Sequence, residues 1–343
     1  MQKRKFFFRE TLESLFDEFL SQKIISEDRY QKYRSLEKSL QEFYQDKKTI
    51  RIGNISLNVR RSFSLKDIDH QVLDDYWAFL MSGHHYSLNT MTAVFNRLRT
   101  FFNWCITTGR LVKSPLRGYN VPTELYGTPV IMTLDEVDAI WNADLSKRPL
   151  LEQQRDIFVF QCCIGCRVSD LLKLKRSSII HGAIEYIPRK TKSGNPVTVR
   201  VPLNSRALQI ISKYQDPAHR AKDYWDRPLL PFISRQKYNV AIKRIFRICG
   251  MNRMVTVMEA STREEIKKPL YEVASSHLAR RTFIGNIYNK VQDPNLISSM
   301  TGHVEGSKAF ARYRVVDDHI KRKLVRILDE RGRTAKTRQG FYI

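Results

Sequence analysis

The chain has 343 residues, which is too many for one small core and fits two domains of ordinary size. Lys and Arg total 59 against 35 Asp and Glu, so the formal net charge is +24, far beyond what solubility requires, and a polyanionic partner is indicated. A membrane surface would also attract this charge, but membrane-binding proteins usually gather their basic residues on one amphipathic helix or tail. Here the basic residues are spread along the whole chain, which favours nucleic acid as the partner.

Neither export nor membrane anchoring is predicted. No apolar run reaches the length of a bilayer span, and the first 20 residues alternate charged and aromatic side chains as an amphipathic helix does. Five cysteines, an odd number in no regular framework, fit a reducing compartment, so the cytoplasm is expected. Cys163 and Cys166 form a C-x-x-C pair. Because no second ligand pair follows at matching spacing, packed thiols are expected rather than a metal site.

Residues 1–118 are predicted to form an all-helical domain with a basic side. Helical apolar spacing occurs in four stretches, which are 11–20, a run after Ser26, 64–80 and a run after Ser87. Ser87 is of the residue type that caps helix N-termini. Arg97 and Arg99 lie off the apolar face of the fourth helix and are candidate DNA contacts. Residues 51–57 are predicted to be a short extended piece.

A linker and a second domain are predicted to follow. Residues 119–130 are rich in Gly and Pro, and Thr133 with Glu136 has the pattern of a capping box, which marks a new helix. We therefore place the second domain at 131–331 and a basic tail at 332–343.

The second domain is predicted to be helical around one small sheet. Two alternating β patterns, 183–187 and 197–201, are joined by a basic segment and indicate a hairpin. Helices are predicted at 154–164, near 169–170, and at 205–214, 238–249, 277–288, 294–300, 307–314 and 317–331. No element is predicted for 251–271. The fold class is mainly α with a small antiparallel β-sheet (α+β).

Six residues of this domain have the chemistry that phosphodiester exchange requires. Guanidinium groups suit the negative charge that gathers on the non-bridging oxygens, and a general acid must protonate the leaving alkoxide. A tyrosine, with a pKa of roughly 10, needs cationic or hydrogen-bonding neighbours to act as the nucleophile. The six candidates, in chain order, are Arg167, Lys192, His277, Arg280, His303 and Tyr313.

In order and context these residues resemble the tyrosine recombinase (phage integrase) family. The motifs are GCRVSDLLKLK around Arg167, TKSGNPVTVRVPL around Lys192, SSHLARRTF, TGH and KAFARY. The resemblance covers roughly residues 130–320. The stretch HHYSLNTMTAVFNRLRTFFNWCITTGRLVKSP is similar to the helical core-binding domain that precedes the catalytic domain in that family.

The resemblance implies a role for each matched residue. Tyr313 would attack the scissile phosphate to leave a 3′-phosphotyrosyl bond and a free 5′-hydroxyl, with no metal or other cofactor. Lys192 would protonate the leaving oxygen. Arg167 and Arg280 would clamp the phosphate, His277 and His303 would bind it or assist proton transfer, and Asp170 would support the first arginine. The family also implies double-stranded DNA as partner, a tetramer on two DNA sites and exchange through a Holliday junction.

Several alternatives remain open. The His-x-x-Arg spacing favours Arg280 over Arg281, which is then a candidate for contacting DNA, and the Lys-Ser-Gly turn favours Lys192 over its neighbour Lys190. Each residue taken singly also fits an ordinary structural role, such as a helix cap or a solvated turn. A type IB topoisomerase shares the same chemistry, and a non-catalytic DNA-binding regulator would use the same scaffold.

Overall fold

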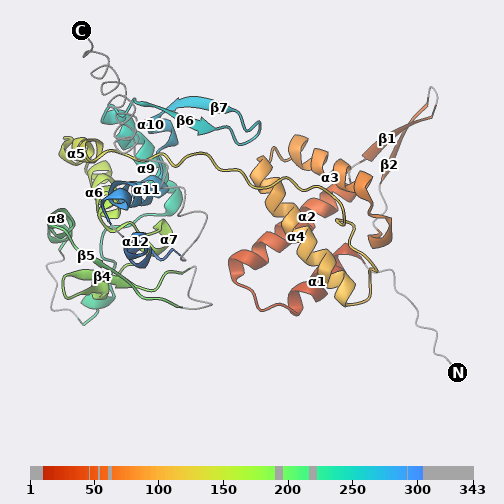
Figure 1. The fold of residues 1–343 in the computed structure, drawn as a ribbon, viewed down its shortest axis with the longest axis horizontal. Helices are drawn as coiled ribbons and strands as arrows, with labels where there is room; N and C mark the ends of the chain where they lie inside the picture. Colours follow the sequence, from red (N-terminus) through yellow and green to blue (C-terminus); the bar gives the residue numbers. More distant parts are fainter. Residues whose placement is uncertain are drawn as a thin grey trace, which may run out of the picture. The chain divides into compact units, whose positions relative to one another are not determined.

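The computed structural model describes residues 11–45, 47–52, 55–60, 64–189, 196–215, 222–291 and 293–303, with the backbone alone for the two stretches between 47 and 60. Two compact units are present (Figure 1), one comprising Met1–Tyr126 with Met258–Glu265 and the other Gly127–Val257 with Ile266–Ile343. Helices predominate and the sheets are small, which confirms the predicted fold class. Within these described ranges, no helix has the length and apolar character of a membrane span.

The first unit contains the four predicted helices, which are α1 (Leu12–Ser21), α2 (Glu27–Gln45), α3 (His70–Ser82) and α4 (Leu88–Thr107). Ser87 accepts a hydrogen bond from the Thr90 N–H and caps α4, as expected. The third helix begins later than the sequence pattern indicated. Asp69 accepts the Val72 N–H and caps it, whereas Ser64 makes no capping bond and precedes a short 3-10 turn, η1 (Leu65–Asp67).

Aromatic side chains form the core of this unit. Phe16 of α1 stacks on Phe101 of α4 with ring centroids 4.4 Å apart, and Phe19 meets the same ring edge-on at 5.6 Å. All three side chains are almost completely buried. This packing fixes α4, and therefore the positions along it of Arg97 and Arg99.

The expectation that this unit is all helical is wrong. Strands β1 (Lys47–Ile52) and β2 (Ile55–Arg60) pair in antiparallel fashion, with Lys47 opposite Arg60 and Ile52 opposite Ile55. The predicted extended piece, residues 51–57, is thus the inner half of a hairpin. The sequence signal was present, because apolar residues alternate on both sides of Gly53-Asn54, a dipeptide typical of tight hairpins.

The second unit is built from short helices and two small sheets. Its helices are α5 (Leu134–Asn142), α6 (Pro149–Ile164), α7 (Val168–Leu171), α8 (Ser205–Lys213), α9 (Arg235–Ile248), α10 (Leu270–Val273), α11 (Ser276–Ile287) and α12 (Pro294–Thr301). Its strands are β3 (Ile179–Ile180), β4 (Ala183–Tyr186) and β5 (Val199–Pro202), in the order β3-β4-β5, with a separate pair β6 (Met254–Met258) and β7 (Glu265–Pro269). The 3-10 turns are η2 (Arg176–Ser178), η3 (Tyr224–Asp226) and η4 (Tyr288–Lys290).

Most predicted elements of this unit are confirmed. The Thr133 and Glu136 capping box starts α5, and β4 pairs with β5 as the predicted hairpin. The stretch 251–271, for which no element was predicted, forms β6, β7 and the first half of α10. The two strands are only partly buried, so apolar and polar residues alternate weakly along this polar stretch. The sequence therefore shows no clear strand pattern. The helices predicted at 307–314 and 317–331 lie outside the described residues.

Helix α6 is the central element of the second unit. It packs against α5, α8, α9 and α11 (Figure 1), and most of its residues are buried on every side. Helix α9 runs antiparallel to it. The Tyr238 hydroxyl donates to the Gln161 side chain over 3.1 Å, and the rings of Phe246 and Phe158 meet edge-on at 5.2 Å.

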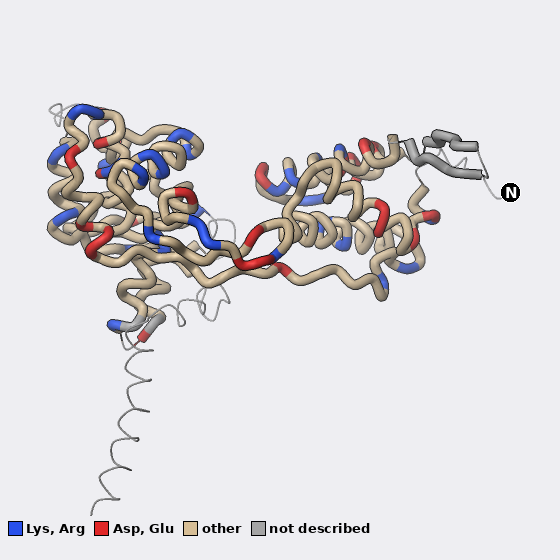
Figure 2. Tube along the Cα trace, turned by 90° about the horizontal axis from the view of Figure 1, so that it is seen from above, with Lys and Arg blue, Asp and Glu red and all other residues tan. Residues whose placement is uncertain are grey.

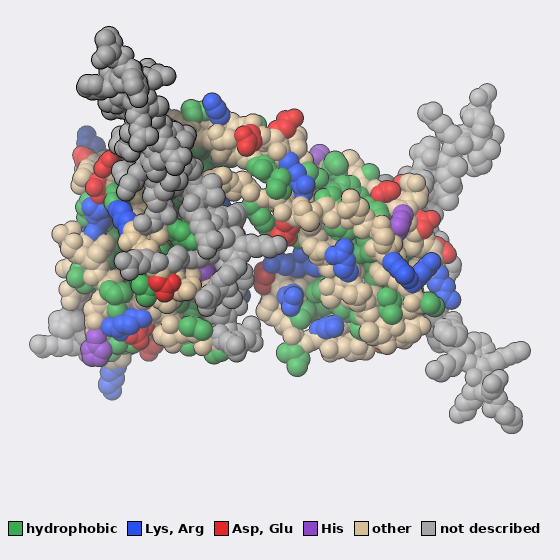
Figure 3. Space-filling model, in the orientation of Figure 1, with side chains coloured by type: hydrophobic (Ala, Val, Ile, Leu, Met, Phe, Trp, Pro, Cys, Tyr) green, Lys and Arg blue, Asp and Glu red, His purple; other side chains and the backbone are tan. Residues whose placement is uncertain are grey.

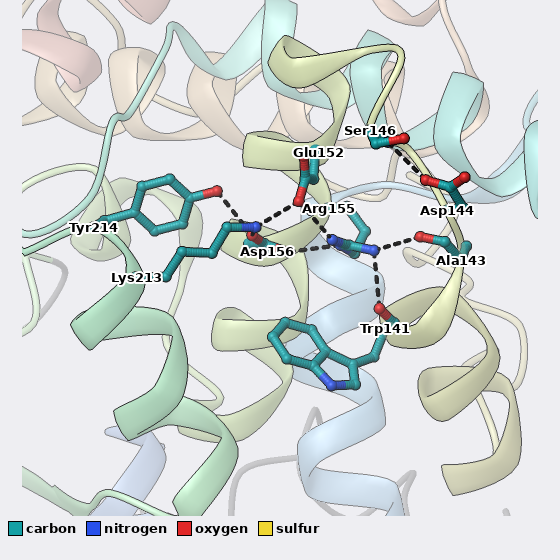
Figure 4. Close-up of polar contacts among 9 residues, drawn as sticks. All are labelled: Trp141, Ala143, Asp144, Ser146, Glu152, Arg155, Asp156, Lys213 and Tyr214. Carbon is teal, nitrogen blue, oxygen red and sulfur yellow. Dashed lines mark hydrogen bonds and ion pairs between the residues drawn. The ribbon is translucent and has the colours of Figure 1, made fainter.

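A buried ionic network ties α5, α6 and α8 together at the middle of α6 (Figure 4). Asp156 is fully buried and accepts hydrogen bonds from Arg155 at 2.6 Å, Lys213 at 2.7 Å and Tyr214 at 2.8 Å. The Arg155 guanidinium also donates to the carbonyls of Trp141 and Ala143, at 2.9 and 2.7 Å. The bond between Arg155 and Asp156 lies within α6, whereas each of the others joins α6 to α5, to α8 or to the residue that ends one of them. The network therefore fixes how the three helices pack.

The substitution Asp156→Asn should therefore lower the free energy of unfolding by about 3 kcal/mol or more, because it leaves the buried guanidinium of Arg155 without its main counter-charge. Urea unfolding measures the change. As a matched control, Asp226→Asn removes the partner of the exposed Lys175, 2.9 Å away, and should change stability by about 1 kcal/mol at most. Equal losses in the two variants would contradict a dominant role for the buried network.

Candidate active site

Arg280 lies at the centre of the candidate site. It is on the second turn of α11, is 1% exposed, and donates to the Gly165 carbonyl over 2.9 Å. The start of α11 is fixed because the Ser276 N–H donates to the Asn239 side chain of α9 over 2.8 Å. A second guanidinium nitrogen of Arg280 lies 3.1 and 3.2 Å from the two ring nitrogens of His303.

Arg167 reaches the same place from another direction. It follows the left-handed Gly165 at the end of α6 and donates to the Gly302 carbonyl over 3.3 Å. The loop that carries it is held by Gln161, whose amide donates to the Cys166 carbonyl over 3.1 Å. Its Nη1 atom is buried and has no hydrogen-bond partner among the described residues, so a donor is available to a ligand.

Two glycines make this arrangement possible. Gly165 ends α6 with φ of 64°, and Gly302 ends α12 with φ of 63°. A Cβ on Gly165 would lie 2.3 Å from the Phe283 ring, and one on Gly302 would lie 2.9 Å from Pro188. Each glycine carbonyl is at the negative end of a helix dipole, where a guanidinium is favoured. Each helix end therefore orients one arginine.

The hydrogen bonds determine which ring nitrogen of a neutral His303 carries the proton. The buried Thr301 hydroxyl donates its single proton to the Ile297 carbonyl over 2.7 Å, so it must accept from His303 Nδ1, which is 2.9 Å away. The proton of the ring then lies on Nδ1. Consequently Nε2 is the acceptor for the Arg280 N–H.

Asp170 holds the start of the segment that contains Lys190 and Lys192. Its Oδ1 accepts the backbone N–H of Arg189 over 2.9 Å, and it lies on α7, three residues after Arg167. Its Oδ2 is buried with no partner in the described part of the chain. The contact observed is thus to the hairpin, and the predicted support of Arg167 by Asp170 stays a prediction.

Sequence reasoning missed Tyr186, at the end of β4. Its hydroxyl is buried and has no hydrogen-bond partner among the described residues, and burial raises the pKa of this phenol. Charges on Arg280, Asp170 and Arg167 influence it, so it lies beside the site. An alternating β pattern marks its strand but not its proximity to residues from α7 and α11, so the sequence carried no signal for it.

The other predicted residues are placed to different degrees. His277 is exposed on the first turn of α11, and Arg281 is half-buried. Lys190, Lys192 and Tyr313 lie outside the described residues. The structure therefore brings together Arg167, Arg280 and His303, with Asp170 nearby on α7.

The two candidate DNA contacts on α4 differ from each other. Arg99 is exposed and donates to the Asn96 side chain over 3.0 Å. Arg97 is half-buried, its Nε has no partner among the described residues, and burial lowers its pKa. Arg97 thus lies partly within the apolar face that it was expected to avoid.

No disulfide forms from the C-x-x-C pair. Cys166 is buried and Cys163 is partly buried, both are free thiols, and burial raises the pKa of each. Across the described ranges, no group of three or more His, Cys, Asp or Glu residues is arranged to hold a metal ion.

Two family models match the chain. The one described as phage integrase SAM-like domain matches residues 10–121, and the one described as phage integrase family matches residues 131–319. Tyrosine recombinase XerC of Proteus mirabilis is 23% identical over 214 residues, which are 61% of this chain and 62% of that protein. The chain thus spans less than two thirds of the length of that relative.

Solved structures share the fold. The Tn1549 transposon integrase in complex with transposon right end DNA superposes with a TM-score of 0.62 at 14% identity, covering 93% of this chain and 100% of that one. A λ integrase tetramer bound to a Holliday junction gives a TM-score of 0.57 at 15% identity, covering 89% of this chain and 77% of that one.

The substitution Gly165→Ala should destabilise the fold by more than the cost of backbone strain, because the added methyl group meets the Phe283 ring. Gly250→Ala is a matched control, since Gly250 has φ of 66° and nothing lies within 4 Å of its added Cβ. We expect the control to lose about 1–2 kcal/mol through strain alone. Thermal or urea unfolding should show a clearly larger loss for Gly165→Ala, and equal losses would mean that the close approach of Phe283 relaxes at no cost.

Proposed function

Because the chain belongs to the phage integrase family, we propose that it is a site-specific DNA recombinase that cleaves and rejoins duplex DNA through a 3′-phosphotyrosyl intermediate. The observation that carries the proposal is the convergence of Arg167 and Arg280 on Gly302 and His303. Two guanidinium groups beside one imidazole suit a phosphate whose non-bridging oxygens gain negative charge.

In the proposed reaction, the phenolic oxygen of Tyr313 attacks the scissile phosphorus as its proton passes to a base, a role open to His277 or His303, and the 5′-oxygen leaves. Lys192 donates a proton to that leaving oxygen, which yields a 5′-hydroxyl and a 3′-phosphotyrosine. Arg167 and Arg280 neutralise the non-bridging oxygens, and His277 and His303 bind the phosphate or assist proton transfer. Attack by another 5′-hydroxyl then reverses the step, regenerates the phenol and rejoins the strands.

The proposal assigns Asp170 an indirect part. Its hydrogen bond to the Arg189 N–H anchors the chain three residues before Lys192, so it would limit the positions open to the general acid. The same anchor precedes Lys190, which remains the competitor for that role.

Duplex DNA is the proposed partner, and the proposed domains are those of the sequence analysis. Lys and Arg occur on both units (Figure 2), and their side chains are spread over the visible face of each (Figure 3). Phosphate contacts from such residues, including Arg97, Arg99, Lys190 and Arg281, would supply salt-dependent affinity. A tetramer on two DNA sites would carry out exchange, as the Holliday junction complex of λ integrase illustrates, and the cytoplasm is the proposed compartment.

The substitution Tyr313→Phe should abolish covalent attachment to DNA and leave binding unchanged, because only the attacking oxygen is removed. The assay incubates the protein with DNA that flanks its gene and detects protein on 3′ ends by denaturing gel. Tyr126→Phe, at an exposed tyrosine, is the control and should form the adduct at the normal rate. Normal attachment by Tyr313→Phe would refute the proposed nucleophile.

Arg280→Lys should slow cleavage by about 10²–10³-fold, because an ammonium cannot replace two donors held in one plane. Arg281→Lys is the matched control on the next residue and should change the rate by less than about tenfold. Single-turnover cleavage measures both rates, and thermal unfolding checks that each variant is folded. A larger loss in Arg281→Lys would reverse the assignment of the two arginines.

A further inference from the structure

A basic cavity lies within the second unit, away from the candidate active site. Its volume is about 830 Å³, and five cationic side chains line it: Arg148, Lys243, Arg244, Arg247 and Lys268. Glu272 is the one carboxylate among its lining residues. The side chains come from the C-terminal half of α9, from β7 and from the residue that precedes α6. This cavity is far larger than one water or one isolated phosphate needs.

Most of these cations have no carboxylate partner in the part of the chain that the structure describes. Among the described residues, Arg148, Lys243, Arg244 and Arg247 form no ion pair with a carboxylate. Elsewhere in the same unit cations are paired, as Lys175 is with Asp226 and Arg227 with Asp223. Like charges placed around one cavity repel each other, and an anion of several charges relieves that repulsion.

The geometry of one side chain favours phosphate. The guanidinium of Arg247 lies over the Tyr271 ring, 4.8 Å from its centroid, which restrains the guanidinium plane and leaves its edges open to a ligand. Phosphate oxygens accept two such N–H bonds in one plane. Several phosphates joined in one chain would meet several cations at once.

The cavity and the candidate active site lie at opposite ends of α6. Arg148 immediately precedes this helix, whereas Gly165, which binds Arg280, ends it. At a rise of about 1.5 Å per residue, the 16 residues of α6 separate the two sites by roughly 24 Å. One strand of B-DNA places about seven phosphates along that distance.

We propose that the basic cavity is a second phosphate-binding site, which holds backbone phosphates of duplex DNA several base pairs from the bond that is cleaved. The phosphate chemistry follows from the cavity itself, whereas DNA as the source of the phosphates rests on the proposed function. The site makes no contact with the reacting phosphate, so its contribution is to affinity and to the position of the duplex.

The test compares two doubly substituted proteins of equal charge. Lys243→Gln with Arg244→Gln removes two exposed cavity cations, and glutamine keeps the helix propensity of α9. Lys175→Gln with Arg227→Gln is the control, because it removes two cations that carboxylates already pair. Fluorescence anisotropy with a random-sequence duplex of about 30 base pairs gives the affinity from about 50 to 200 mM salt.

In the cavity variant, the slope of log K against log salt should be less steep by about two units than in the parent chain. Between about 50 and 200 mM salt, the affinity of this variant should therefore fall by about tenfold less than that of the parent chain. The control should keep the parental slope. Equal slopes in the cavity variant and the control would overturn the proposal, provided that circular dichroism shows both to be folded.

Two further probes identify the occupant. Inorganic tripolyphosphate should compete with the duplex for the parent chain and less well for the cavity variant. If tripolyphosphate binding depends on Lys243 and Arg244 but the salt dependence of DNA binding does not, the phosphates that occupy the cavity do not come from DNA. Preferential binding of poly-glutamate would overturn phosphate altogether. Covalent trapping through Tyr313 is measured separately, so failure of the cavity and failure of the proposed recombinase give different results.

Discussion

Backbone carbonyls at the ends of two helices hold two guanidinium groups, the buried one of Arg280 and the partly buried one of Arg167, and the rest of the site depends on this constraint. Gly165 binds Arg280 and Gly302 binds Arg167. A carbonyl and a neutral imidazole orient a cation without cancelling its formal charge, which a carboxylate would do. The arginines are thus placed in advance for an anion, and little reorganisation is needed when a phosphate arrives.

The packing of helix α6 in the second unit holds the Gly165 carbonyl in place. Most of the buried residues of α6 are apolar. Two of its buried polar side chains have partners that fix the helix: Asp156, at the middle of α6, in the ionic network, and Gln161, in the last turn, beside the arginine loop. Because a buried helix packed on several sides cannot tilt freely, the Gly165 carbonyl keeps its place. The network at the middle of α6 and the guanidinium contact at its C-terminal end therefore belong to one rigid element.

The buried Arg155 and the cations of the basic cavity differ in their partners. Arg155 is neutralised by Asp156 inside the packed region, where an unpaired charge would be costly. The cations of the basic cavity face solvent, where repulsion is screened and a polyanion has access. Part of the surplus positive charge of the chain thus lines a cavity that is open to solvent, where it is useful for binding.

The sequence alone determined the elements whose signals are local. Capping residues fixed the starts of α4 and α5, the Gly after Ile164 fixed the end of α6, and alternation fixed β4 and β5, because each depends on neighbours a few residues away. The order of motifs also selected Arg167, Arg280 and His303 as candidates, and the structure places these three residues together. Tertiary structure alone decided that Arg280 binds Gly165, 115 residues earlier, that Tyr186 lies beside the site, and that cations from α9, β7 and the start of α6 share one cavity. Such contacts join residues far apart in the chain, and no local pattern encodes which helix end a side chain will meet once the core has packed.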